Sequence, residues 1–212
     1  FISLRCHRDC YYCFNPNQVD YEHFTTHQRD LVGELDAIHA QGQKMDYLAL
    51  TGGEPLLHKD EAIAFFKRAS EQFPHTHKRL YTCGDYVDEP ALRELQAAGL
   101  EEIRFSIRMH DSQAARRHIL DRIALATQTI PAVMVEMPVL PGTLGEMQTI
   151  LTELDRIGIF GINLLELCYP LINAEEFNAR EFRVKHRPFE TLYDYWYAGG
   201  VPVSGSELVC LD

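Results

Sequence analysis

Residues 46–73 read DYLALTGGEPLLHKDEAIAFFKRASEQF, and this stretch holds one complete unit of the expected fold. The apolar run at 46–51 predicts a strand, because it is short and ends at a pair of glycines. After the Gly-Gly-Glu-Pro turn at 52–55, apolar side chains recur at helical spacing over 59–73. The stretch therefore predicts a strand, a tight turn and a helix in succession.

The same alternation continues on both sides of this stretch. Further strands are predicted at 1–4, 78–83, 101–108, 133–140 and 162–167, and further helices at 26–41, 88–98, 112–126 and 144–157. Six strand–helix repeats of about 30 residues predict an α/β fold, in which parallel strands are joined by helices that pack outside the sheet. The pattern by itself leaves open whether the sheet closes into a barrel.

Three cysteines near the start of the chain, Cys6, Cys10 and Cys13, are spaced Cys-x3-Cys-x2-Cys. Thiolates this close cannot all lie on one face of a strand or helix, so we expect a cysteine loop, residues 6–13, wrapped around a metal centre. Soft sulfur ligands select zinc or an iron–sulfur cluster. A closed zinc site needs a fourth ligand, for which only His7 is near, whereas a [4Fe-4S] cluster with one open iron needs three. The spacing favours the cluster.

Two other uses of cysteine fit the sequence less well. A disulfide framework is unnecessary, because 212 residues with 46% hydrophobic content can bury a core without covalent links. A thioredoxin-like pair made of Cys10 and Cys13 accounts for two cysteines rather than three. Cys168 and Cys210 stand alone in the sequence, so they do not predict a second cluster.

The cysteine loop, with Tyr12 just before its last cysteine, resembles the cluster-binding loop of the radical S-adenosylmethionine (SAM) superfamily. The turn formed by Gly52, Gly53, Glu54 and Pro55 is similar to that family's Gly-Gly-Glu-Pro motif, and the two motifs follow in the family's order. The resemblance implies a partial (β/α)6 TIM-like barrel with parallel strands and outer helices. It places the active site, and Tyr12 with it, at the carboxyl ends of the strands.

The resemblance also implies cofactors and roles. Cys6, Cys10 and Cys13 would hold a [4Fe-4S] cluster whose fourth iron binds SAM, and the main-chain carbonyls of 52–55, with Glu54, would support the SAM ammonium group. One electron from a flavodoxin- or ferredoxin-type donor would cleave SAM to a 5′-deoxyadenosyl radical, which abstracts hydrogen from a substrate. The substrate stays open between a glycyl-radical enzyme, a peptide and a small molecule. The alternative is a zinc-binding structural or interaction protein that uses the same cysteines.

Strand ends supply further candidate ligands for SAM. On the strand at 101–108, Ser106 and Arg108 share one face, and by resemblance this face points toward SAM. An arginine departs from the acidic or amide residue commoner in the family, and it suits the carboxylate of SAM or of a substrate. Glu136 lies in an otherwise apolar strand, where an ionised carboxylate is costly unless paired. We therefore expect Glu136 in the barrel lumen, beside Arg108 or SAM.

Other strand ends carry weaker signals. Cys83 stands where relatives often have asparagine, and it is predicted to be a buried thiol. Asn163 and Glu166 are three residues apart on one strand, so they cannot both face the lumen. The basic stretch at 180–187 is predicted to be a solvated surface, with a patch for an anionic group of the substrate as the alternative.

The end of the chain is its most individual part. The aromatic segment at 193–200 suits either the core or a cap over the open side of the barrel, since substrate pockets favour aromatic walls. We expect one radical SAM core domain over 1–212, with 188–212 as its candidate cap. Because the chain begins without methionine inside an expected strand and stops as an apolar segment resumes, we expect a partial sequence.

Composition narrows the function classes. No run approaches the ~20 apolar residues of a membrane span and no signal peptide is visible, so we expect a cytoplasmic protein with reduced cysteines and no membrane partner. The formal net charge of −11 disfavours nucleic acid as a partner, because phosphate backbones are bound through lysine and arginine.

Overall fold

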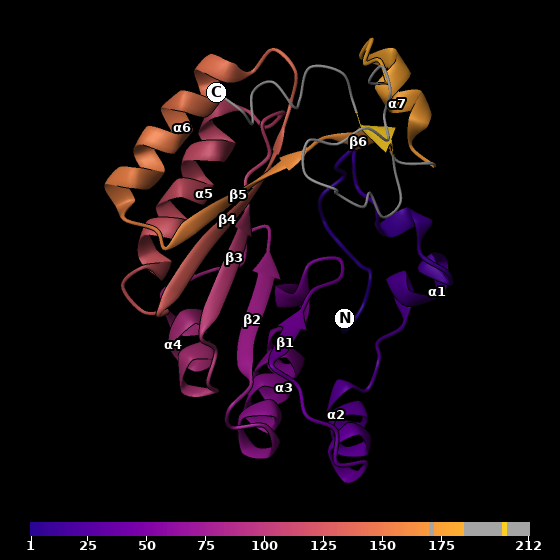
Figure 1. Cartoon of the computed structure of the whole chain (residues 1–212), viewed down its shortest axis with the longest axis vertical. Helices are drawn as coiled ribbons and strands as arrows, with labels where there is room; N and C mark the ends of the chain where they lie inside the picture. The colour runs from indigo at the N-terminus through magenta and orange to yellow at the C-terminus, as the bar shows by residue number, and fades with distance from the viewer. Residues whose placement is uncertain (170–171, 185–200, 203–212) are drawn as a thin grey trace.

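The computed structural model describes residues 1–169, 172–184 and 201–202. Its centre is a sheet of five parallel strands in the order β1-β2-β3-β4-β5 (Figure 1). The strands are β1 (Tyr47–Leu50), β2 (His77–Thr82), β3 (Glu102–Ser106), β4 (Ala132–Val139) and β5 (Gly161–Glu166). The predicted α/β fold with parallel strands is confirmed.

A helix follows each of the first four strands, as parallel neighbours require. These helices are α3 (Lys59–Gln72), α4 (Glu89–Ala97), α5 (Gln113–Ala126) and α6 (Leu144–Ile157). Their starts carry the expected caps: Asp88 accepts a hydrogen bond from Ala91 N at 2.8 Å, and Ser112 accepts one from Ala115 N at 3.2 Å. In Figure 1, α4, α5 and α6 lie along one side of the sheet.

The two faces of the sheet differ in polarity. Ile103 and Phe105 are fully buried on the helix side, and β2 and β4 alternate between buried and partly buried residues along their whole length. Arg104 and Glu136 point to the opposite face, where they form an ion pair at 2.6 Å. This half-covered polar face corresponds to the barrel lumen predicted from the period of two.

The start of the chain differs from the prediction. Residues 1–4 do not form a strand, because their main chain bonds to the helix at 21–26 and to the link after it instead of to β1: Leu4 N donates to Phe24 O and Arg29 N donates to Ile2 O, both at 2.8 Å. The described sheet therefore has five strands rather than six.

The helix predicted at 26–41 is also interrupted. The chain forms α1 (Tyr21–Thr26) and α2 (Leu31–Ala40), separated by a short non-helical link. Asp30 ends that link by accepting a hydrogen bond from Gly33 N at 2.9 Å, which caps α2. Periodicity located the apolar face of this region but not the cap inside it.

Beyond β5, the chain crosses to the other edge of the sheet. Two short strands, β6 (Cys168–Tyr169) and β7 (Val201–Pro202), pair antiparallel, and α7 (Ala174–Ala179) lies on the same side of the sheet as α1 (Figure 1). Apart from β7, the predicted cap at 188–212 lies outside the described residues. In the part of the chain that the structure describes, no helix has both the length and the apolar character needed to cross a membrane.

Replacing Phe177 of α7 by alanine is expected to lower the free energy of unfolding by about 3–5 kcal/mol. The Phe177 ring is 0% exposed and packs edge-on against Tyr11 of the cysteine loop, with ring centroids 5.3 Å apart. Urea unfolding measures the loss. Phe160→Ala is the matched control, because Phe160 is 75% exposed and its loss should cost within about 0.5 kcal/mol. Equal losses in both variants would contradict the packing of α7 on the cysteine loop.

Candidate functional site

The cysteine loop lies over the carboxyl ends of the first two strands. Arg5, just before the loop, accepts a hydrogen bond from Glu54 N at 2.8 Å, beyond the end of β1. Arg8, inside the loop, donates from Nε to Asp85 Oδ2 at 2.7 Å, beyond the end of β2. The structure therefore brings the cysteines to the edge of the sheet where α/β proteins bind ligands.

The three thiols are spaced for a group larger than a single ion. All are free, and Cys6 is exposed whereas Cys10 and Cys13 are half-buried. Two sulfurs on one zinc ion, each about 2.3 Å from it, cannot lie more than about 4.6 Å apart. Among the described residues, the one group of metal-ligating side chains whose donor atoms all lie within 4.8 Å of one another contains none of these cysteines. The three cysteine sulfurs are therefore not all within that distance of one another, which fits a multi-iron cluster better than a single ion.

The electrostatics of the thiols also suit a cationic centre. Burial raises the pKa of Cys10 to about 11, and the neighbouring thiols Cys13 and Cys6 add to the rise. Burial likewise raises the pKa of Cys13. At neutral pH these thiols therefore stay protonated, and they lose their protons when a metal centre binds. Cysteine metal sites behave in this way. The donor set fits an iron–sulfur cluster.

The two glycines of the Gly-Gly-Glu-Pro turn let the start of the chain cross directly above it. A Cβ on Gly53 would lie 2.0 Å from Arg5 O, and one on Gly52, whose φ is +130°, would lie 2.6 Å from Ser3 O. Gly53 N donates to Ser3 O at 3.1 Å. No larger residue fits at either position, so the turn fixes the backbone that leads into Cys6.

Glu54 ties the ends of β1 and β2 together. Its side chain is buried, and its carboxylate accepts hydrogen bonds from Leu56 N at 2.9 Å, Thr82 Oγ1 at 2.9 Å and Cys83 N at 2.7 Å. Pro55 follows as the first residue of the short 3₁₀ helix η2 (Pro55–His58). This internal role of the Glu54 carboxylate was not evident from the sequence.

Arg108 lies just beyond β3 and beside the cysteine loop. The side chain is 3% exposed, its Nε donates to Asp111 Oδ2 at 2.9 Å, and its charge lowers the pKa of Cys10 against the larger effect of burial. Nη2 lies 2.8 Å from the same Asp111 oxygen but makes no hydrogen bond within the described residues. A buried donor left this way is costly, and an anionic group of a bound cofactor would satisfy it.

Ser106 and Glu136 face each other across β3 and β4 in the strand register. The sequence predicts Glu136 beside Arg108 or SAM, but its ion-pair partner is Arg104. Arg104 Nη1 donates to Glu136 Oε1 at 2.6 Å. Asn163 Nδ2 donates to the same oxygen at 2.9 Å. Asn163 is therefore the member of the pair on β5 that shares the lumen face with Glu136.

Aromatic side chains pack against the far arm of the cysteine loop, residues 10–13. Tyr12 packs edge-on against His110, with ring centroids 5.3 Å apart, and the Arg180 guanidinium stacks 4.1 Å from the Tyr11 ring centroid. Asn173 Nδ2 also donates to Cys13 O at 3.4 Å. Arg180 therefore serves in part as a contact to the loop rather than only as solvated surface. Tyr11 and the segment around α7 carry no local signal, and sequence reasoning missed them.

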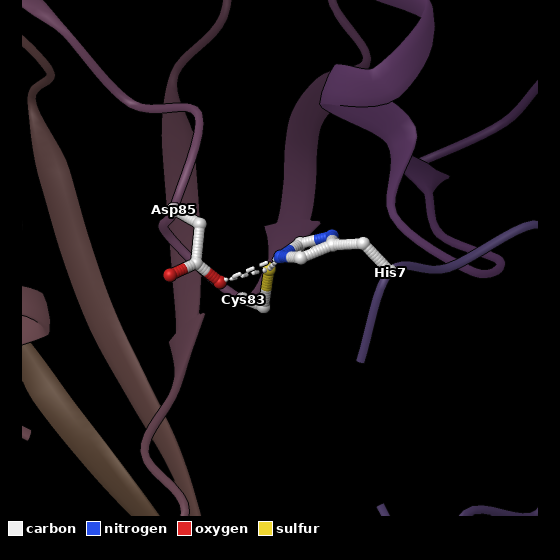
Figure 2. A group of neighbouring side chains, drawn as sticks. All are labelled: His7, Cys83 and Asp85. Carbon is white, nitrogen blue, oxygen red and sulfur yellow. Dashed lines mark hydrogen bonds and ion pairs between the residues drawn. The ribbon is translucent and has the colours of Figure 1, made fainter. Parts of the chain in front are cut away.

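Cys83 and Asp85, at the end of β2, meet His7 of the cysteine loop (Figure 2). Cys83 is buried, as predicted, and its Sγ donates to Asp85 Oδ2 at 3.1 Å. Burial alone would raise the pKa of Asp85, but hydrogen bonds from Arg8 and two further donors hold it well below its usual range. Sequence reasoning missed Asp85, although its place just after a strand end and a glycine marks it as a turn residue.

Two further cysteines, Cys168 and Cys210, stand outside the cysteine loop in the sequence. Cys168 is half-buried and its Sγ donates to Glu166 O at 3.6 Å. Cys210 and the aromatic segment at 193–200 lie outside the described residues. Within the described part of the chain, no second cysteine cluster forms.

Comparison with known proteins shows the family of this chain. The sequence model of the Radical SAM superfamily matches residues 1–154. A putative glycyl-radical enzyme activating enzyme of Methanocaldococcus jannaschii is 28% identical over 200 residues, which cover 87% of this chain and 51% of the relative. A PqqA peptide cyclase of Xanthomonas oryzae is 32% identical over 134 residues, which cover 61% of this chain and 32% of the relative. The chain thus spans about half the length of the first relative and about a third of the second.

Solved structures share the fold. Coproporphyrinogen III oxidase (HemN) from Escherichia coli, a radical SAM enzyme, superposes with a TM-score of 0.63 at 16% identity, over 97% of this chain and 48% of that one. The enzyme anSMEcpe, solved with bound AdoMet and a peptide, gives a TM-score of 0.64 at 14% identity, over 80% of this chain and 50% of that one. These similarities confirm the partial TIM-like barrel.

The matched region holds the cysteine loop, the Gly-Gly-Glu-Pro turn and β1 to β4, which form the candidate site. The chain therefore belongs to the radical SAM superfamily, whose cofactors are a [4Fe-4S] cluster and SAM.

Proposed function

We propose that this chain is the catalytic core of an enzyme that cleaves SAM reductively and uses the product to abstract hydrogen from a substrate. The observation that carries the proposal is a loop of three free thiols, fastened over the strand ends beside a buried arginine whose Nη2 has no hydrogen bond within the described residues. When bound and reduced, the cluster supplies the electron that converts SAM to methionine and a 5′-deoxyadenosyl radical. The protein positions both partners and excludes water.

The cysteines and the Gly-Gly-Glu-Pro turn form one half of the proposed site. We assign Cys6, Cys10 and Cys13 as the cluster's protein ligands, which leaves one coordination position for SAM. The SAM ammonium is assigned to the main chain of 52–55. The Glu54 carboxylate contributes charge at most, because it already accepts three hydrogen bonds from the protein.

Polar residues on β3 and β4 form the other half. Arg108 Nη2 is assigned to the methionine carboxylate of SAM, because a bidentate or single charged hydrogen bond would satisfy this buried donor. Ser106 is assigned to the ribose, and Glu136, opposite Ser106 in the register, to the same cavity. Tyr12, packed against His110, is assigned to the wall beside the cluster.

A polypeptide is the substrate class that the relatives favour. The relative that covers 87% of this chain is named as an activating enzyme of a glycyl-radical enzyme, and another is named as a peptide cyclase. We further propose a cytoplasmic setting and a flavodoxin- or ferredoxin-type electron donor. Nucleic acid is disfavoured as a partner, and no membrane partner is proposed. Replacement of dithionite by reduced flavodoxin in a SAM cleavage assay tests the donor.

Anaerobic reconstitution tests the proposed function against its alternative. The enzyme should be brown, hold about four irons per chain and form 5′-deoxyadenosine from SAM under dithionite. A colourless protein that holds zinc and cleaves no SAM would instead support the zinc-binding structural or interaction protein.

Truncation before Tyr193 tests the proposed organisation of 1–212 as one core domain with a cap at 188–212. The truncated chain should keep its SAM affinity and its uncoupled 5′-deoxyadenosine formation within about twofold, since no assigned SAM ligand lies in the removed segment. Turnover of a peptide substrate, once one is identified, should be lost. Loss of SAM binding on truncation, at matched iron content, would contradict the assignment.

A further inference from the structure

Asp85 holds the two residues that follow Cys6. Arg8 donates to both of its carboxylate oxygens, with Nε 2.7 Å from Oδ2 and Nη2 bonded to Oδ1. His7 Nε2 lies 2.9 Å from Oδ2 (Figure 2). Within the described residues, every hydrogen bond that joins residues 6–9 to another segment ends on Asp85 or on its neighbour Cys83. Apart from the Arg5 main chain, which is held by Glu54 N, and an edge-on contact between the His7 and Tyr86 rings, residues 6–9 are attached through this one turn.

The far arm of the loop, residues 10–13, is held by burial and by packing. Cys10 and Cys13 are half-buried and joined by a turn in which Cys13 N donates to Cys10 O at 2.9 Å, with aromatic contacts around them. Cys6 is exposed. Since Cys6 lacks burial, its position depends on the contacts of the residues beside it.

Asp85 is itself rigidly placed. Its side chain is 16% exposed, and it follows Gly84, whose N donates to Thr82 Oγ1 at 3.0 Å. Cys83 N, in the same turn, donates to Glu54 Oε2 at 2.7 Å. The carboxylate is therefore connected through Glu54 to the Gly-Gly-Glu-Pro turn, unlike the mobile partner of a surface ion pair.

His7, Cys83 and Asp85 also carry the types of donor atom found in zinc sites. His7 Nε2, Cys83 Sγ and Asp85 Oδ2 lie within 4.8 Å of one another, with Sγ 3.8 Å from Nε2. However, Arg8 already occupies both carboxylate oxygens, and Arg108 Nη2 lies 4.0 Å from Oδ2. A divalent cation would meet two permanent positive charges there, so the geometry favours an anchor over a metal ion.

We propose that Asp85 is a positioning residue for the cluster, which acts by holding His7 and Arg8 so that Cys6 presents its sulfur to iron. The inference rests on the proposed function, because it assigns Cys6 as a cluster ligand. It adds a role for a residue outside both motifs. It also implies that Asp85 offsets the charge of Arg8 next to the cluster.

The test compares Asp85→Asn with the wild type and with a control, Asp36→Asn. Asp36 lies on α2, and its Oδ1 is 2.6 Å from Nε of Arg68 on α3. Reconstituted proteins are mixed with a ferrous chelator, and cluster loss is followed by absorbance. Asp85→Asn should lose its cluster about tenfold faster or more, as expected for a lost charged hydrogen bond. Its cluster reduction potential should rise, because a negative charge is removed. Asp85→Glu should partly restore both values, and Asp36→Asn should match wild type.

A second variant guards against a fold defect. Arg8→Gln breaks the same contact from the side of the loop, at a side chain that is 28% exposed. The double variant should release its cluster no faster than the faster single variant. Wild-type release rates in both single variants, or additive effects in the double variant, would overturn the anchor. So would stoichiometric zinc binding by the apo-protein that Asp85→Asn abolishes, since that result identifies a metal site. A wild-type protein that binds no iron would instead overturn the proposed function.

Discussion

Alanine at any one of Cys6, Cys10 or Cys13 is expected to abolish the reductive cleavage of SAM. Each thiolate is one of the three assigned protein ligands of the cluster, so its loss removes a third of that ligation and leaves an iron exposed to solvent. The measurement is 5′-deoxyadenosine formed from SAM under dithionite, together with iron per chain after anaerobic reconstitution. Formation should fall to the level seen without protein.

The other cysteines are the matched controls for this result. Cys83→Ala and Cys168→Ala should keep about four irons per chain and most of the cleavage activity, because neither sulfur belongs to the loop. The same is expected of Cys210→Ala, which lies outside the described residues. Retained cleavage in any loop variant would refute the ligand assignment. A loss of iron in Cys168→Ala or Cys210→Ala would refute the single cluster.

Replacing Arg108 by alanine is expected to weaken SAM binding about 10- to 150-fold without emptying the cluster. The guanidinium is almost fully buried and its Nη2 makes no hydrogen bond within the described residues, so SAM would gain a charged hydrogen bond of roughly 1.5–3 kcal/mol there. Equilibrium dialysis of SAM at matched iron content measures the change.

Arg93→Ala is the control for this prediction. The Arg93 side chain is 72% exposed, and within the described residues it pairs with Glu89 along helix α4. That variant should bind SAM as the wild type does. Unchanged SAM affinity in Arg108→Ala would mean that Arg108 serves the loop or the substrate instead. Such a result would leave the family assignment intact and move the SAM carboxylate to another residue.

Much of the fold could be predicted because its signals are local. The α6 helix begins and ends at the predicted residues, and β2, β4 and β5 lie within one residue of their predicted starts and ends. Apolar periodicity and glycine or proline boundaries act within a few residues of the chain, so they are readable without a structure. The cluster motif is local in the same sense, since three thiols within eight residues must share one loop.

The sequence by itself therefore determined the alternation of strands and helices, the loop of three cysteines and the superfamily. Only the tertiary structure decided which partners each group meets. Residues 1–4 fail to form a strand because Gly53 brings their main chain onto the Gly-Gly-Glu-Pro turn. Asp85 reaches Arg8, and α7 reaches Tyr11, only when the chain is folded. These contacts join segments that are far apart in sequence, and no short-range pattern encodes them.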